Sequence, residues 1–184
     1  AAALHSRLLF ETLDLTHKQR LCPVQLWCSP STTHPDFKRA VHEYPVSLHC
    51  QCGKDLGERM EQAIAVNLTR FTSVLLMGCD CPSLRVQDLI DSFSALESGC
   101  EVVLGPAEDG GYVLIGMKQA LPELFLNIPW GSSAVLEETR ARIKSLNLPC
   151  FETRQQWDLD RPEDLKRYAS FAIEEKRSPA RQPK

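Results

Sequence analysis

Short apolar runs alternate with longer segments of mixed apolar and polar residues along most of the chain. The runs at residues 72–77 (TSVLLM) and 101–104 (EVVL) are aliphatic and β-branched, without regular polar alternation. Such runs are typical of parallel-type strands buried on both faces of a sheet. Because segments with helical periodicity lie between the strand-like runs, the pattern predicts an α/β fold.

The expected elements extend to residue 173. Helices are predicted at residues 1–15, 36–44, 55–68, 84–96, 119–126, 133–146 and 162–173. Strands are predicted at residues 24–28, 46–50, 72–77 and 150–157, with a hairpin-like pair at 101–106 and 112–117. We therefore expect one domain over residues 1–173. Residues 174–184 are polar, contain proline and lack aromatic side chains, so they are predicted to form a disordered tail.

Composition narrows the class of protein. A chain of 184 residues with 43% apolar content can bury a core of its own, and its net charge of −3 provides no broad basic surface. A nucleic acid or an anionic membrane is therefore a less favoured partner than a small or phosphorylated ligand. No run approaches the roughly 18 apolar residues of a membrane span, and the first residues lack a signal-peptide layout. We expect a cytoplasmic protein.

The cysteine and histidine patterns do not favour a metal centre built from these residues. The eight cysteines contain no C-x-x-C pair, which a zinc module would require. Cys28, Cys50, Cys79 and Cys100 lie in or beside apolar strands, where a reduced cysteine acts as a small hydrophobic residue. All five histidines lie at or before His49, far in sequence from the acidic loops described next.

Asp80 lies in the sequence GCDCPSL, directly after the most hydrophobic predicted strand. In open α/β sheets the ligand crevice lies beyond the carboxyl ends of the strands. A carboxylate there is a natural ligand for Mg²⁺ or Mn²⁺, which bind through one or two protein carboxylates and substrate phosphates. Alternatively, Asp80 satisfies amides of its own loop. Pro82 and Ser83 then begin a helix, with Ser83 as a plausible N-cap.

Asp109, Gly110 and Gly111 follow the next apolar run, in GPAEDGGY. Asp-Gly between two apolar runs is a common sign of a tight hairpin, so a turn is the favoured interpretation of these residues by themselves. Two glycines also leave the backbone bare and allow a ligand to approach closely. A turn and a binding site are compatible here.

The sequence DLDRPEDL at residues 158–165 contains both the predicted start of a helix and a candidate metal ligand. Asp160 is predicted to cap the helix, with Glu163 completing a capping box. Asp158 has no capping role in this scheme and follows a predicted strand. It is therefore the candidate for a second metal ligand, or else a solvated loop residue.

Three further residues are candidates for substrate binding. Trp130 either packs in the core or forms a flat wall of the pocket. Ser132 belongs to the same WGSS stretch, in which Ser132 or Ser133 is expected to cap the following helix. Arg59 near the start of a long helix is either a surface charge or a bidentate phosphate ligand.

Five stretches carry a resemblance to a known family over most of residues 1–173. They are CGKDLGERM (52–60), LLMGCDCPSL (75–84), VVLGPAEDGGYVLIGM (102–117), WGSS (130–133) and DLDRPEDL (158–165). With these, the chain resembles the DUF2064 nucleotide-diphospho-sugar transferases of bacteria. That family is related to the GT-A glycosyltransferases and to the molybdenum-cofactor and phospholactate nucleotidyltransferases.

The resemblance implies a GT-A, Rossmann-like three-layer sandwich with a mainly parallel sheet, which binds a nucleotide-sugar or nucleotide through Mg²⁺ or Mn²⁺. It implies that Asp80 is a catalytic residue and the principal metal ligand, and that Asp158 is the second ligand. Asp109, also catalytic, would line the sugar or acceptor pocket with Gly110 and Gly111, and Arg59 would contact phosphate. The leading activity is glycosyl transfer to a small-molecule acceptor. The alternatives are nucleotidyl transfer to a phosphorylated acceptor and a non-catalytic nucleotide- or sugar-binding module.

The sequence departs from the family pattern at its first residues. Family members begin with an apolar strand and a Gly/Lys/Arg-rich nucleotide-binding loop, whereas Ala1 corresponds to the helix that follows them. Without a strand in the centre of the sheet, the strands at 24–28 and 72–77 would each have one unpaired edge. We therefore expect the 184-residue sequence to be a fragment or a truncated product.

This expectation predicts weak nucleotide binding by the 184-residue chain, because the phosphate-cradling loop would be absent. Isothermal titration calorimetry with nucleotides and Mg²⁺ measures it directly. Binding in the micromolar range would contradict the prediction.

Overall fold

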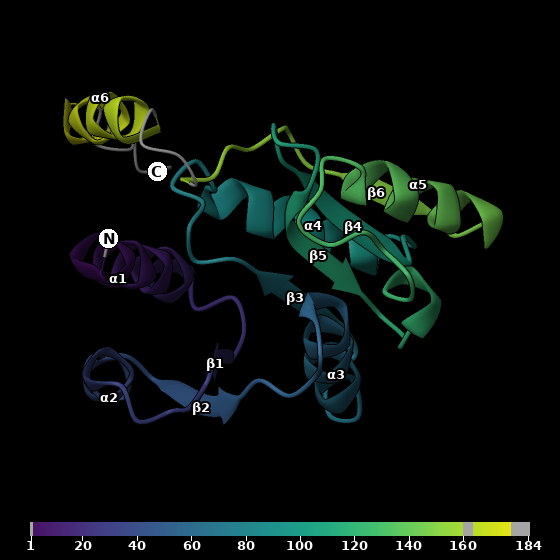
Figure 1. Ribbon diagram of the computed structural model, residues 1–184, viewed down its shortest axis with the longest axis horizontal. Helices are drawn as coiled ribbons and strands as arrows, with labels where there is room; N and C mark the ends of the chain where they lie inside the picture. Colours follow the sequence, from purple (N-terminus) through teal and green to yellow (C-terminus); the bar gives the residue numbers. More distant parts are fainter. Residues whose placement is uncertain (1, 160–163, 178–184) are drawn as a thin grey trace.

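The structure is a computed structural model that describes residues 2–159 and 164–177 (Figure 1). The helices are α1 (Ala2–Gln19), α2 (Pro35–Glu43), α3 (Leu56–Leu68), α4 (Val86–Glu97), α5 (Val135–Ser145) and α6 (Asp164–Arg177), with a 3-10 turn η1 (Pro122–Leu124). The strands are β1 (Val24–Cys28), β2 (Val46–Cys50), β3 (Val74–Met77), β4 (Val102–Pro106), β5 (Tyr112–Met117) and β6 (Cys150–Glu152).

The described strands form two sheets. β1 and β2 make a parallel pair, and the second sheet has the order β3-β5-β4-β6. In the second sheet β3, β4 and β6 run in one direction, and β5 lies antiparallel between β3 and β4. The α/β class is confirmed, and so is the antiparallel pairing of the two hairpin-like runs.

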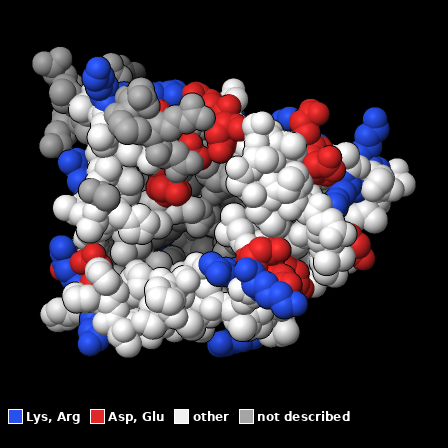
Figure 2. All heavy atoms as spheres, viewed as in Figure 1, with Lys and Arg blue, Asp and Glu red and all other residues white. Residues whose placement is uncertain are grey.

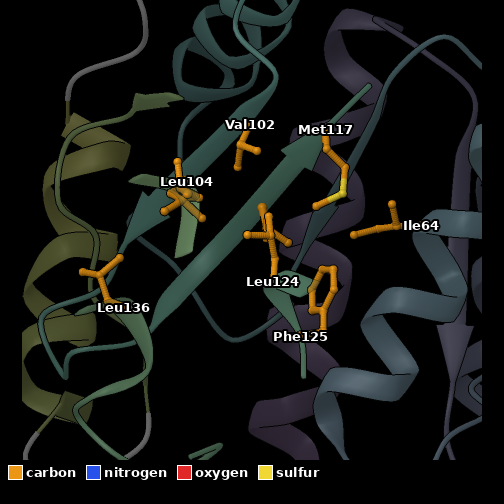
Figure 3. Packing of buried hydrophobic residues seen from close by; sticks show 9 residues of the cluster. Ile64, Val102, Leu104, Met117, Leu124, Phe125 and Leu136 are labelled. Atoms are coloured by element: carbon orange, nitrogen blue, oxygen red, sulfur yellow. The ribbon is translucent and has the colours of Figure 1, made fainter. Parts of the chain in front are cut away.

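Helices cover both faces of the four-stranded sheet, which gives the expected three layers. On one face Val102, Leu104 and Met117 pack against Ile64 of α3 and Leu136 of α5 (Figure 3). On the other face the alternate strand residues, including Val103 and Leu114, pack against Leu89 and Leu96 of α4. Because successive side chains of a strand point to opposite faces, alternate residues of β4 enter two separate cores.

The two runs predicted to be buried differ in their environment. All residues of β4 are buried, whereas all four residues of β3 are only half-buried. β3 pairs only with β5 and β1 pairs only with β2, so each has one unpaired edge among the described strands. The prediction of full burial is therefore wrong for residues 72–77, because a strand with one neighbour keeps an open edge. The expected unpaired edges are confirmed.

Three predicted helix boundaries need correction. The helix expected at 119–126 is only the 3-10 turn η1, because Pro122 disfavours helical backbone before it and Asn127 adopts a φ of 53°. Helix α5 begins at Val135 with Ala134 as its N-cap, so neither Ser132 nor Ser133 caps it. Helix α6 continues to Arg177, beyond the expected boundary at residue 173.

Other predictions concern residues outside the described ranges. The expected cap by Asp160 and Glu163 lies there, as do residues 178–184 of the expected tail. Among the described helices, none combines the length and apolar character needed to cross a membrane.

Candidate active site at the carboxyl edge of the sheet

Three chain segments meet where β3, β4 and β6 end. Gly78 follows β3, and its N–H donates to the Val113 carbonyl at the start of β5 at 2.9 Å. The β4–β5 connection pairs with the segment after β6 through a parallel bridge between Ala107 and Gln156. The loops that contain Asp80, Asp109 and Asp158 therefore share one edge, as the carboxyl-end rule predicts. Figure 2 shows a hollow near the position of β3, with acidic side chains along its upper rim.

Asp80 and Asp158 lie on adjacent segments. The N–H of Leu159, the residue after Asp158, donates to the Asp80 carbonyl at 3.0 Å. Both aspartates are half-buried at this edge. Two residues that are far apart in sequence are thus placed side by side by a main-chain hydrogen bond.

Gly78 provides the space for the Asp80 carboxylate. A Cβ at position 78 would lie 2.7 Å from Asp80 Oδ1, closer than non-bonded atoms can pack. The absence of a side chain at Gly78 therefore lets the carboxylate turn back over the end of β3.

Ser83 does not cap helix α4, contrary to the prediction. The N-cap is Arg85, whose N–H donates to the Asp88 carboxylate at 2.8 Å. Ser83 is instead 2% exposed, and its hydroxyl accepts a hydrogen bond from Trp157 N at 2.9 Å. Its Oγ also lies 2.9 Å from Gln156 Oε1, so it joins the Asp80 loop to the Asp158 segment.

Asp109 has a local role in the turn. Its Oδ1 accepts a hydrogen bond from Gly111 N at 2.8 Å, and its side chain is exposed. Gly110 has a φ of 90°, and a Cβ there would lie 2.2 Å from the Ser133 carbonyl oxygen. Leu136 N donates to the Gly110 carbonyl at 2.9 Å. The turn interpretation is confirmed, and the turn is docked on the segment that precedes α5.

Trp130 forms a wall built from aromatic rings and a glycine. It stacks on Phe125 at a centroid distance of 6.5 Å and meets Tyr112 edge-on at 6.3 Å. Gly57, buried in the first turn of α3, leaves so little room that a Cβ would lie 2.4 Å from Trp130 Nε1. Trp130 is therefore packed, although its side chain stays half-exposed. Ser132 is exposed, and its Oγ accepts from Ala134 N at 3.3 Å.

Arg59 is a half-buried cation near the start of α3. Its Nε donates to the Gly53 carbonyl at 3.1 Å, and it makes no ion pair in the described part of the chain. The described arginines that do pair with acids are Arg7 with Glu11, Arg39 with Glu43, Arg140 with Glu152, Arg154 with Asp88 and Arg167 with Glu108.

The contacts divide the predicted residues into two groups. Asp80 and Asp158 form one, and the glycine turn with the Trp130 stretch forms the other. The structural roles of Ser83, Gln156 and Gly57 were not predicted from the sequence. A glycine inside a predicted helix was a usable signal for Gly57. Nothing in the local sequence distinguished Gln156 from an exposed strand residue.

The thiols beside Asp80 are not poised as metal ligands. Burial, with a smaller contribution from Asp80, raises the pKa of Cys79 to about 11. Burial also raises the pKa of Cys81. All eight cysteines are free, and the described residues contain no group of three or more His, Cys, Asp or Glu that could hold a metal ion.

Residues 12–132 match the family described as "Uncharacterized protein conserved in bacteria (DUF2064)", and the chain belongs to this family. No functionally curated protein matches the chain.

Solved structures share the fold. A candidate nucleotide-diphospho-sugar transferase from Desulfovibrio desulfuricans G20 is 25% identical, with a TM-score of 0.84 over 98% of this chain and 78% of that one. A 4-diphosphocytidyl-2C-methyl-D-erythritol synthase is 13% identical, with a TM-score of 0.62 over 90% of each chain. A cytidylyltransferase from Leptospira borgpetersenii serovar Hardjo-bovis (strain JB197) is 12% identical, with a TM-score of 0.58 over 94% of this chain and 84% of that one.

The raised thiol pKa values predict slow alkylation beside Asp80. At pH 8 Cys79 stays protonated, so iodoacetamide should modify it at least about tenfold more slowly than the exposed Cys52, and burial should slow the reaction of Cys81 as well. Peptide mass spectrometry over a time course measures the rates. Equal rates at the three cysteines would show that the thiols beside Asp80 are reactive.

The Ser133 backbone lies so close to Gly110 that adding a single methyl group there should lower the stability of the protein strongly. Gly110→Ala should lower the free energy of unfolding by about 2 kcal/mol more than Gly131→Ala, because the Ser133 backbone must move. Gly131 is a matched control, since its φ is 81° and a Cβ there would meet nothing within 4 Å. Urea denaturation measures both variants. Equal losses would mean that only the positive φ matters.

Proposed function

We propose that the protein transfers a glycosyl group from a nucleotide-sugar donor to an acceptor, with Mg²⁺ or Mn²⁺ held by Asp80 and Asp158. The observation that carries the proposal is the Leu159–Asp80 hydrogen bond, which places the two aspartates on adjacent segments at the carboxyl edge of the sheet. The likeness to the candidate nucleotide-diphospho-sugar transferase supports the donor class.

The donor set fits a hard divalent cation. Two carboxylates provide oxygen ligands and leave positions for water and for the oxygens of a diphosphate. The cation would supply charge neutralisation on the leaving diphosphate. In the described residues no larger set of ligands competes for this role.

Arg59 provides a second attraction for an anion. Its Nε is held by the Gly53 carbonyl, and no acid neutralises the guanidinium in the described part of the chain. The terminal guanidinium nitrogens therefore remain available to a phosphate group, which arginine binds with two parallel hydrogen bonds.

The turn at Asp109 and the wall at Trp130 suit the acceptor or the sugar. The turn leaves the Asp109 side chain exposed, and the half-exposed indole offers a flat apolar surface. In this proposal Asp109 accepts hydrogen bonds from sugar hydroxyls. Gly110, whose side-chain space is filled by the Ser133 backbone, and Gly111 border the same pocket as parts of the turn.

A nucleotidyltransferase is the second candidate, because two of the similar solved structures are a cytidylyltransferase and a 4-diphosphocytidyl-2C-methyl-D-erythritol synthase. Such an enzyme would release pyrophosphate, whereas glycosyl transfer releases a nucleoside diphosphate. Product analysis separates the two.

The central test is Asp80→Asn in an assay of nucleoside diphosphate release from a panel of nucleotide-sugars with Mn²⁺. Loss of a charge beside the leaving group should lower turnover at least about 100-fold. Asp91→Asn is the matched control, because Asp91 is an exposed acid on α4 that accepts a hydrogen bond from Gln87 Nε2 and lies outside the candidate site. The activity of this variant should be unchanged.

Three results would contradict the proposal. The first is equal activity of the two variants, and the second is release of pyrophosphate from nucleoside triphosphates without any release of nucleoside diphosphate from nucleotide-sugars. The third is metal-independent nucleotide binding that Asp80→Asn leaves intact, which would indicate a non-catalytic binding module.

A further inference from the structure

We infer that Ser83 and Gln156 form a positioning pair that sets the separation of Asp80 and Asp158. This inference rests on the proposed function, because it assigns the pair to the assembly of the cation site. Neither residue is assigned to contact the cation or the substrate.

Ser83 joins the two segments through a hydroxyl group that uses both its donor and its acceptor capacity. Its Oγ accepts from Trp157 N at 2.9 Å and lies 2.9 Å from Gln156 Oε1 and 3.1 Å from the Trp157 carbonyl oxygen. One proton serves these two acceptors. The Cys81 thiol also points to the Trp157 carbonyl, at 3.4 Å.

Gln156 fixes the same segment to the end of β4. Its side chain is fully buried, with 0% exposure. Its main-chain N–H donates to the Pro106 carbonyl at 2.8 Å, and its main-chain carbonyl accepts from Glu108 N at 3.0 Å. Its Nε2 donates to the Arg154 carbonyl at 3.2 Å. The side-chain amide is oriented by its two partners, Ser83 Oγ and the Arg154 carbonyl, and the two main-chain hydrogen bonds leave the segment little freedom to slide.

These contacts enclose Asp158 between two points of attachment to the Asp80 loop. Trp157 is held by Ser83 on one side of Asp158, and Leu159 is held by the Asp80 carbonyl on the other. The main-chain separation of the two aspartates therefore cannot change unless one attachment breaks. A shared cation requires this separation to be constant, since its ligand distances vary by only a few tenths of an ångström.

Ser92 shows what a purely structural buried serine looks like in the same protein. It is 0% exposed, and its Oγ donates to the Asp88 carbonyl at 2.6 Å within helix α4. Its hydrogen bond joins residues one turn apart, so its loss does not loosen one segment from another. Ser92→Ala is therefore the matched control for Ser83→Ala.

The experiment compares Ser83→Ala and Ser92→Ala for binding of Mn²⁺ alone, with no nucleotide added. The electron paramagnetic resonance signal of free Mn²⁺ follows the binding. Both variants are studied at a temperature where circular dichroism shows them folded. We expect Ser83→Ala to raise the Kd for Mn²⁺ about tenfold or more, the scale for losing a group that orients metal ligands. Ser92→Ala should stay within about twofold of the unmodified protein, because it leaves the ligands in place.

The outcomes separate this inference from the function on which it rests. If Mn²⁺ binding depends on Asp80 but Ser83→Ala and Ser92→Ala behave alike, the positioning role is overturned and the proposed function stands. If Mn²⁺ binding does not depend on Asp80, the proposed function fails first. Should Ser83→Ala fail to fold, Ser83→Cys keeps a side chain of similar size with a weaker donor. A several-fold rise in the Kd then supports the inference, and an unchanged Kd overturns it.

Discussion

The burial of strand β4 is the constraint on which the described structure depends. Val102, Val103 and Leu104 are each 0% exposed, and β4 has a hydrogen-bonded neighbour on both sides. Its alternate residues enter two cores, one under α3 and α5 and one under α4. Because burial of apolar area is the main stabilising contribution in a domain of this size, this strand fixes the register of its neighbours. It also fixes where they end, and the candidate site lies at those ends.

Beyond the sheet, the site is assembled by hydrogen bonds between loops. The segment after β6 is attached first by Arg154, whose guanidinium lies 3.0 Å from the buried Asp88 carboxylate. It is then held by Gln156 and Ser83, and finally by the contact from Leu159 to Asp80. Buried polar groups are costly when they lack partners, so a chain of satisfied contacts favours one arrangement over near alternatives. These contacts hold the irregular segments that carry Asp80 and Asp158 next to each other.

The second half of the site depends on two glycines. Gly57 lets the indole of Trp130 lie against helix α3, and Gly110 lets the Ser133 backbone lie against the β4–β5 turn. Residues 130–133 before α5 are therefore packed between helix α3 and the β4–β5 turn, at the same edge as the aspartates. The proposed roles follow from this arrangement. Asp80 and Asp158 would face the diphosphate, whereas Trp130 and the β4–β5 turn would face the sugar or the acceptor.

Much of the secondary structure could be predicted from the sequence, because it follows from local patterns. The strands at 24–28 and 46–50 have the predicted bounds, and the hairpin pairing and the loop positions of the three aspartates also follow from apolar periodicity and turn residues. The prediction was wrong where the same local sequence is compatible with two structures. Examples are the helix expected at 119–126, which is a 3-10 turn, and the cap expected at Ser83. Only the tertiary structure decided that β5 lies between β3 and β4, that Ser83 faces Gln156, and that Gly57 faces Trp130. Hydrophobic periodicity indicates which face of a helix or strand is buried. It does not indicate the residues against which that face packs, because these come from segments far apart in the chain.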